Sequence, residues 1–400
     1  MQTLITLIFG LVLSSPTASP QPMRLDCEWL QLATPANECT LAGGWELAAH
    51  GQRTGDPGFY RFALAIAREF QHRPRQRTEA VLLKGFALQQ LHRFDEAYRA
   101  VKPLLASAPL ASVHQLLGDI RLEQGRLEQA ADHYQQQLNL KPSPAAYTRG
   151  AQVRFLAGDV PGALELLALA LEGAARSSDR RELAFALRLG GRFLLARGDF
   201  TAAVRMLKDS VQLAPTPGSR LLLARAQLAA GDGRIACGTL TDLSRDYPAP
   251  DAVAWLEGLP ACVQAGAEDL SLPAKARRLD ARGYARYLLA NGREIATAAA
   301  LLKGELTQRR DPVTLALAAW ADLESGRAAA AALKTREALA RPYPEPLPYL
   351  IAALVAEQRQ HFQLRDQHLA RVSQQIFLLS PREREIYARL NGSAFKPQDS

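Results

Sequence analysis

Residues 118–142 read GDIRLEQGRLEQAADHYQQQLNLKP, and this stretch predicts a pair of antiparallel helices. Two helices approach closely only where their side chains are small, so we expect Gly118 on the first helix to face Ala130 on the second. Gly125 stands where a left-handed residue ends the first helix without a steric penalty from a Cβ atom. Pro142 ends the second helix, because it has no amide to donate and clashes with the preceding turn. One hairpin cannot bury its own apolar face, so the stretch also predicts neighbours on both sides.

The same pattern recurs along the chain. The alanine of the second helix returns at intervals of roughly 33 residues, with threonine at one place: Ala97, Ala130, Ala163, Ala203, Ala236, Thr297 and Ala331. A turn residue stands five positions before each of them: His92, Gly125, Gly158, Gly198, Gly231, Gly292 and Gly326. Asp159 and Asp199 follow their glycines, and we expect each to cap the next helix by accepting an amide hydrogen bond. This recurrence predicts a repeat architecture.

Residues 78–345 resemble the tetratricopeptide repeat family. They share its period, its turn, its Ala-x3-aromatic pattern and its closing proline. The resemblance implies an all-α protein: a right-handed superhelical solenoid of about seven to eight helical hairpins with a cap at each end. A hydrophobic content of 48% with only 7% aromatic residues agrees with a core of Ala and Leu. We expect the 400 residues to form one continuous body.

The N-terminus predicts export. Leu4–Leu13 is an apolar run too short to span a bilayer, and small residues follow it, so residues 1–20 are interpreted as a signal peptide. An uncleaved N-terminal anchor is the alternative. Beyond it we expect a helical cap, five repeats, an irregular connector, further repeats with a capping helix, and a disordered tail: 23–77, 78–250, 251–274, 275–392 and 393–400. Within this order, Asp56-Pro57 begins a helix and residues 173–181 form a polar loop.

The cysteines agree with export. Their number is four, which is even, and none of them lies in a CxxC pair. We favour disulfides that join Cys27 to Cys39 and Cys237 to Cys262, one of three possible pairings. The alternative is four buried thiols in a cytoplasmic protein.

No pattern of catalytic residues stands out. The chain has no HExxH, no GxSxG, no glycine-rich phosphate loop and no Cys or His cluster with metal-ligand spacing. We therefore expect a protein that is not an enzyme and has no cofactor or metal. Trp255 and Trp320 are interpreted as core or interface residues rather than ligand-stacking residues.

Arginines give the one pattern with functional content. In the family that the repeats resemble, positions 5 and 9 of each repeat face a concave groove. On this chain these positions are occupied by five arginines, and Arg278 lies one helical turn before Arg282. Together they predict a basic groove: Arg188, Arg192, Arg225, Arg278, Arg282 and Arg286. At the N-terminal repeats the same positions are apolar or acidic: Leu82, Phe86, Gln115 and Asp119. Guanidinium groups bind carboxylates or phosphates through paired hydrogen bonds. The alternatives are that acidic side chains of neighbouring helices neutralise these arginines, or that the chain is merely rich in arginine.

These observations favour a non-catalytic scaffold of the periplasm or cell envelope. Its expected partner is a protein or an extended, acidic peptide in the groove. One alternative is an accessory protein of envelope or polysaccharide export that binds an anionic polysaccharide. Another is a helical accessory region of a cell-wall enzyme complex. A net charge of +8 suits nucleic acid, but export argues against that partner, and no transmembrane span is expected in the mature chain.

Overall fold

The computed structural model describes residues 40–177, 179–247, 250–259, 262, 280–340 and 343–392. Every regular element in these ranges is a helix, and the expected all-α superhelical repeat architecture is confirmed. An N-terminal hairpin consists of α3 (Leu41–Thr54) and α4 (Pro57–Phe70). Eight hairpins follow, here numbered repeats 1 to 8: α5 (Arg77–Gln90) with α6 (Phe94–Val101) and α7 (Leu104–Ser107); α8 (Ala111–Glu123) and α9 (Leu127–Leu140); α10 (Pro144–Leu156) and α11 (Val160–Arg176); α12 (Arg180–Arg197) and α13 (Phe200–Leu213); α14 (Pro217–Ala229) and α15 (Gly233–Asp246); α19 (Ala281–Ala290) and α20 (Ile295–Leu306); α21 (Pro312–Glu324) and α22 (Ala328–Ala338); α23 (Leu347–Gln358) and α24 (Phe362–Ser373).

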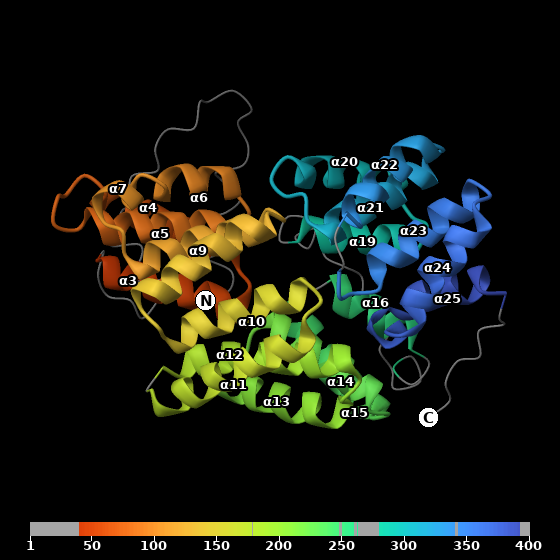
Figure 1. Cartoon of the computed structure of the whole chain (residues 1–400), viewed down its shortest axis with the longest axis horizontal. Helices are drawn as coiled ribbons and strands as arrows, with labels where there is room; N and C mark the ends of the chain where they lie inside the picture. Colours follow the sequence, from red (N-terminus) through yellow and green to blue (C-terminus); the bar gives the residue numbers. More distant parts are fainter. Residues whose placement is uncertain are drawn as a thin grey trace, which may run out of the picture.

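Three further elements complete the chain. Helix α16 (Pro250–Gly258) lies between repeats 5 and 6, and the short 3-10 helix η1 (Ile376–Leu378) and helix α25 (Pro381–Leu390) follow repeat 8. The hairpins turn around a centre, so that the teal helices α19 and α20 come back beside the N-terminal arm (Figure 1). The side-chain Nε2 of Gln375 donates to the carbonyl oxygen of Ala196 at 2.9 Å, which ties the end of repeat 8 to repeat 4.

The turns within the repeats have the predicted left-handed residue. The φ angle is positive at His92 and at each predicted glycine: Gly125, Gly158, Gly198, Gly231, Gly292 and Gly326. Asp159 accepts the amide hydrogen of Gly162 at 2.9 Å, and Asp199 accepts that of Ala202 at 3.4 Å. Asp56 likewise caps α4 by accepting from Gly58 at 2.7 Å. These observations confirm the local predictions. The sequence could predict these features because each depends only on neighbouring residues.

The alanine register holds in six repeats and is wrong in one. Ala97, Ala130, Ala163, Ala203, Ala236 and Ala331 are all fully buried. In repeat 6 the buried residue is Ala298, while Thr297 is only half-buried. The reason is one extra turn residue: Glu294 adopts φ 43° and precedes α20, so each later position moves on by one.

Two other expectations are corrected. Gly118 faces Tyr134 rather than Ala130, because a Cβ atom at Gly118 would lie 2.4 Å from Cε1 of Tyr134. Residues 173–181 do not form a polar loop. Helix α11 continues to Arg176 and α12 begins at Arg180, so most of the extra residues lengthen the two helices.

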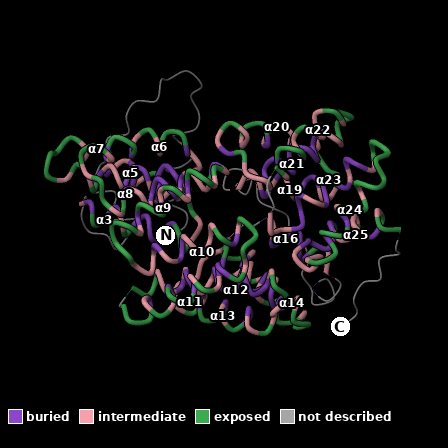
Figure 2. The backbone as a smooth tube through the Cα atoms, in the orientation of Figure 1, coloured by how far each residue is buried: buried purple, intermediate pink, exposed green. Residues whose placement is uncertain are grey.

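The core runs through the hairpins, and exposed backbone lies mainly on turns and outer faces (Figure 2). Trp255 and Trp320 are each 1% exposed, which confirms their interpretation as core residues. A disulfide joins Cys237 of α15 to Cys262. Several predictions lie outside the described residues: the signal peptide (1–20), the Cys27–Cys39 pair, most of the connector, and the tail (393–400).

Candidate functional site

A cavity of about 840 Å³ lies at the centre of the ring of repeats. Residues from repeats 1 to 7 and from α16 line it, together with the connections that precede α21 and α23. Its charged lining residues nearly balance: Arg126, Arg188, Arg192, Arg225, Arg282, Arg286, Arg309 and Arg310 against Asp95, Glu123, Asp251, Asp280, Asp311, Glu337 and Glu345. A cavity of this size is typical of sites that bind small molecules.

The fold brings five of the six predicted arginines to this cavity. Arg188 and Arg192 lie on α12, Arg225 on α14, and Arg282 and Arg286 on α19. The four-residue spacing on α12 and α19 places each pair on one helix face, as the repeat register predicts. Arg278 lies outside the described residues.

Carboxylates of other elements neutralise four of the five arginines. Arg192 forms an ion pair with Glu345 of the α22–α23 connection. Arg225 and Arg286 share Asp251 of α16, at 3.5 and 3.6 Å. Arg282 lies 3.4 Å from Asp311, which precedes α21.

Arg286 has the strongest pairing. Its Nε and Nη2 donate to the two carboxylate oxygens of Glu383 at 2.7 and 2.8 Å, and the Glu383 side chain is fully buried. Glu383 also accepts the amide hydrogen of Ser380 and so caps α25. The neutralisation that the sequence left open as an alternative therefore holds for these arginines.

Sequence reasoning missed the carboxylates, because they come from connections and from the C-terminal helix rather than from groove positions. It also missed Arg309, whose side chain is only 3% exposed and donates to Glu305 at 2.7 Å. The repeat pattern does not predict these residues, because only the closure of the ring brings them close to the groove arginines.

Arg188 differs from its neighbours. Within the described part of the chain, no carboxylate lies within 4.0 Å of its guanidinium group, which instead lies 4.9 Å from the centre of the Phe185 ring. Burial, and then the charge of Arg192, lowers the pKa of Arg188 to about 10, and Glu123 opposes that shift. Arg188 is thus a half-buried cation of the cavity that has no carboxylate within ion-pair distance among the described residues.

The neighbouring arginines also shift the pKa values of two cavity carboxylates, Glu345 and Asp311. Burial raises the pKa of Glu345, but the charges of Arg192 and Arg225 outweigh it, so the pKa lies below its ordinary value. The pKa of Asp311 is also lowered, because Arg282 and Arg309 outweigh its burial. Both carboxylates are therefore ionised at neutral pH.

The concave face is closed rather than open along its length. The amide of Arg310 donates to the carbonyl oxygen of Gln124 at 3.2 Å, and a Cβ atom at Gly125 would lie 2.8 Å from the backbone of Arg310 and Asp311. We call this contact, between residues 124–125 and 310–311, the clasp. It joins repeat 2 to the α20–α21 connection. The groove expected for an extended peptide is therefore a central cavity that the clasp closes on one side.

The N-terminal groove positions do not line the cavity. Asp119 is paired with Arg149, whose Nε and Nη2 donate to its carboxylate at 2.9 and 3.0 Å. Phe86 packs against Trp45, with ring centres 5.5 Å apart. This end of the superhelix is therefore occupied by internal packing.

Among the described residues, no group of three or more His, Cys, Asp or Glu side chains is arranged to hold a metal ion. In the same residues, none of the helices combines the length and apolar character that a membrane crossing requires.

Comparison with known proteins agrees with the repeat geometry. Residues 113–145, which cover repeat 2, match the family model of the tetratricopeptide repeat. Tetratricopeptide repeat protein 36 of Bos taurus is 42% identical over 98 residues, which cover 23% of this chain and 52% of that protein. The chain thus spans about half the length of this curated relative.

Solved structures are similar in fold alone. Human IFIT1, as a dimer with m7Gppp-AAAA, is 15% identical with a TM-score of 0.47, over 80% of this chain and 76% of that one. A tetratricopeptide repeat protein from Parabacteroides merdae is 15% identical with a TM-score of 0.33, over 70% and 98%. MamA is 18% identical with a TM-score of 0.31, over 43% and 92%.

Proposed function

Because this chain is built from tetratricopeptide repeats, we propose that it is a non-catalytic interaction scaffold whose central cavity accepts an acidic group of a protein partner at Arg188. Repeat solenoids present concave surfaces to their partners, and the cavity is the concave surface of this one. The observation that carries the proposal is the unpaired guanidinium of Arg188 among neighbours that each have a carboxylate.

The charge pattern favours one acidic group over a continuous acidic segment. A cation held away from water without a counter-charge is unfavourable, and a partner's carboxylate would relieve that cost. Guanidinium and carboxylate groups pair through two parallel hydrogen bonds, roughly twice as strong as neutral ones. Arg192, Arg225, Arg282 and Arg286 are already paired, and the clasp closes one side, so a side chain or chain end of the partner fits better than a long strand.

The proposal also places the protein in an exported compartment, the periplasm or cell envelope. The apolar stretch Leu4–Leu13 is typical of a signal peptide. The disulfide between Cys237 and Cys262 supports the same location, because such bonds persist in oxidising compartments.

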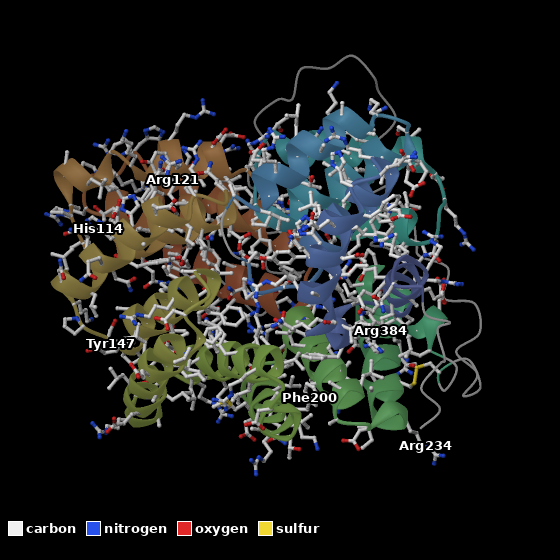
Figure 3. The ribbon with its side chains drawn as sticks, turned by 45° about the vertical axis from the view of Figure 1, so that its right-hand side comes forward. His114, Arg121, Tyr147, Phe200, Arg234 and Arg384 are labelled. Atoms are coloured by element: carbon white, nitrogen blue, oxygen red, sulfur yellow. A yellow bond between two sulfur atoms is a disulfide. The ribbon has the colours of Figure 1, made fainter. Side chains whose placement is uncertain are left out.

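The test compares two charge-removing variants. Immobilised wild-type chain, Arg188→Gln and Arg234→Gln are exposed to the native exported fraction and to a library of acidic peptides. Arg234 is the matched control, since it is exposed in the first turn of α15, at the edge of the molecule, and does not line the cavity (Figure 3). We expect a partner that wild type and Arg234→Gln retain and Arg188→Gln loses.

Equal retention by all three proteins would overturn the role of Arg188. Retention of an anionic polysaccharide, steeply reduced by salt and indifferent to peptide sequence, would favour the polymer instead of the protein partner.

A further inference from the structure

A pair of histidines lies in repeat 2, away from the cavity. His114 of α8 and His133 of α9 place their Nδ1 atoms 3.3 Å apart, with ring centres 5.4 Å apart and ring planes at 54°. Neither residue lines the central cavity. His114 lies at the edge of the N-terminal arm, on the side away from the C-terminal hairpins (Figure 3).

We propose that His114 and His133 form a binding site for one divalent transition-metal ion, Cu²⁺, Ni²⁺ or Zn²⁺, which both Nδ1 atoms ligate and water completes. The proposal is independent of the cavity and of the acidic partner. The bound metal ion would link the two helices of this hairpin, α8 and α9.

The spacing of the donors fits such an ion. With metal–nitrogen bonds of about 2.0–2.1 Å, two nitrogen atoms separated by 3.3 Å subtend an angle of roughly 104–111° at the metal. That range includes the tetrahedral angle, so the ion can sit between the two rings without moving the helices apart. A modest rotation of each ring would direct both lone pairs at it.

The imidazoles have the required protonation state. Burial lowers the pKa of His114. Burial also lowers the pKa of His133, as do the charges of His114 and Arg121, while the charge of Asp132 acts in the opposite direction. Both rings are therefore neutral at pH 7, and neutral imidazole is the form that ligates metals. In the metal-free pair one Nδ1 carries the shared proton. Binding needs only a tautomeric shift of that proton to Nε2, and no proton leaves the site.

The two helices hold the donors in place. Tyr134 packs over Gly118 and its hydroxyl donates to Asp119 at 2.8 Å, and Asp119 is fixed in turn by Arg149. Gln137 donates to Gln115 at 3.1 Å across the same helix pair. A rigid support of this kind keeps ligand spacing constant, which favours chelation. Since the described residues supply no third His, Cys, Asp or Glu ligand here, only ions with a strong preference for imidazole fit the site.

The test titrates the tag-free, oxidised full chain with Cu²⁺, Ni²⁺ and Zn²⁺ by calorimetry. The variants are His114→Ala, His133→Ala, the double variant, and His361→Ala as the matched control, because His361 is an exposed single histidine at the start of α24. We expect one equivalent bound, with Cu²⁺ bound most tightly. Each single variant of the pair should lose at least tenfold in affinity, while the control keeps wild-type affinity.

Two further readouts separate chelation from folding defects. The double variant should bind no more tightly than either single variant, because one substitution already breaks the chelate. Saturating metal should raise the Tm of wild type and of His361→Ala, but not of the pair variants. Stoichiometric binding that survives in the double variant, or absence of binding in wild type at millimolar metal, would overturn the proposal.

Discussion

The amide of Arg310 donates a hydrogen bond to the carbonyl oxygen of Gln124, 3.2 Å away, although Gln124 belongs to repeat 2 and Arg310 to the connection between repeats 6 and 7. This bond is the centre of the clasp, and it turns a solenoid of neighbour contacts into a closed ring. Cooperativity in an open solenoid comes from adjacent repeats only. Here the N-terminal and C-terminal arms also stabilise each other directly.

The clasp predicts unequal effects of two glycine substitutions. Gly125→Ala and Gly198→Ala both place alanine at a positive φ angle, of 77° and 89°, which costs about 1–2 kcal/mol in either case. Only at Gly125 would the new Cβ meet backbone, since nothing lies within 4 Å at Gly198. We expect Gly125→Ala to lose about 1–3 kcal/mol more in urea unfolding, from overpacking. It should also expand the chain in small-angle scattering, and equal behaviour of the two variants would show that the clasp contributes nothing.

Removing Arg286 should leave a buried charge. Arg286→Met deprives the fully buried Glu383 of its partner, and we expect the free energy of unfolding to fall by about 3–5 kcal/mol. The double variant Arg286→Met/Glu383→Gln keeps the acceptor for Ser380 but has no unpaired carboxylate, so it should be more stable than Arg286→Met. Chemical denaturation measures both. A double variant less stable than the single one would contradict this account.

Acid should destabilise the ring through its paired carboxylates. The pKa of Glu345 is lower in the folded chain than in the unfolded chain, so the unfolded state binds more protons once the pH approaches the unfolded pKa of about 4.3. The contribution of this group is complete above that pH and is lost as the pH falls through the lower folded pKa. Unfolding measured from pH 7 to pH 3 should show a steeper loss for wild type than for Glu345→Gln. Glu46→Gln, which removes an exposed carboxylate, should follow wild type.

The register of repeat 6 can be tested directly. Ala298 is fully buried and Thr297 is half-buried, so Ala298→Met should cost about 1–3 kcal/mol by overpacking, while Thr297→Met should change stability by about 0.5 kcal/mol or less. Thermal unfolding of the two variants distinguishes the two registers. The opposite order would restore the register that simple repeat spacing predicts.

The disulfide should stabilise repeat 5. Cys237 and Cys262 are 25 residues apart, and closure of such a loop stabilises by about 3 kcal/mol in the chain-entropy model. Wild type should therefore unfold at lower denaturant in the presence of a reductant. Cys237→Ser/Cys262→Ser serves as the control, and any reductant effect that persists in it must come from the other two cysteines.

Helix positions and caps were predictable because each depends on residues a few positions away. The left-handed turns, the Asp caps and the buried alanines all follow from the repeat pattern. Errors arose where the chain has more residues than the repeat pattern. The extra residue before α20 shifted the alanine register, and the longer helices α11 and α12 absorbed residues that polar composition assigned to a loop.

By itself, the sequence determined that this chain is an array of helical hairpins and that Arg188, Arg192, Arg225, Arg282 and Arg286 share its inner face, because spacing along a helix decides which face a side chain occupies. Tertiary structure alone decided which of these arginines have a counter-charge. Glu345, Asp251, Asp311 and Glu383 reach them from other repeats and connections, and only closure of the ring brings them within a few ångströms. Coulomb energies depend on distance in space and on desolvation, neither of which a repeat period encodes. For that reason only the folded chain shows that, among the described residues, Arg188 has no carboxylate partner while the other four arginines do.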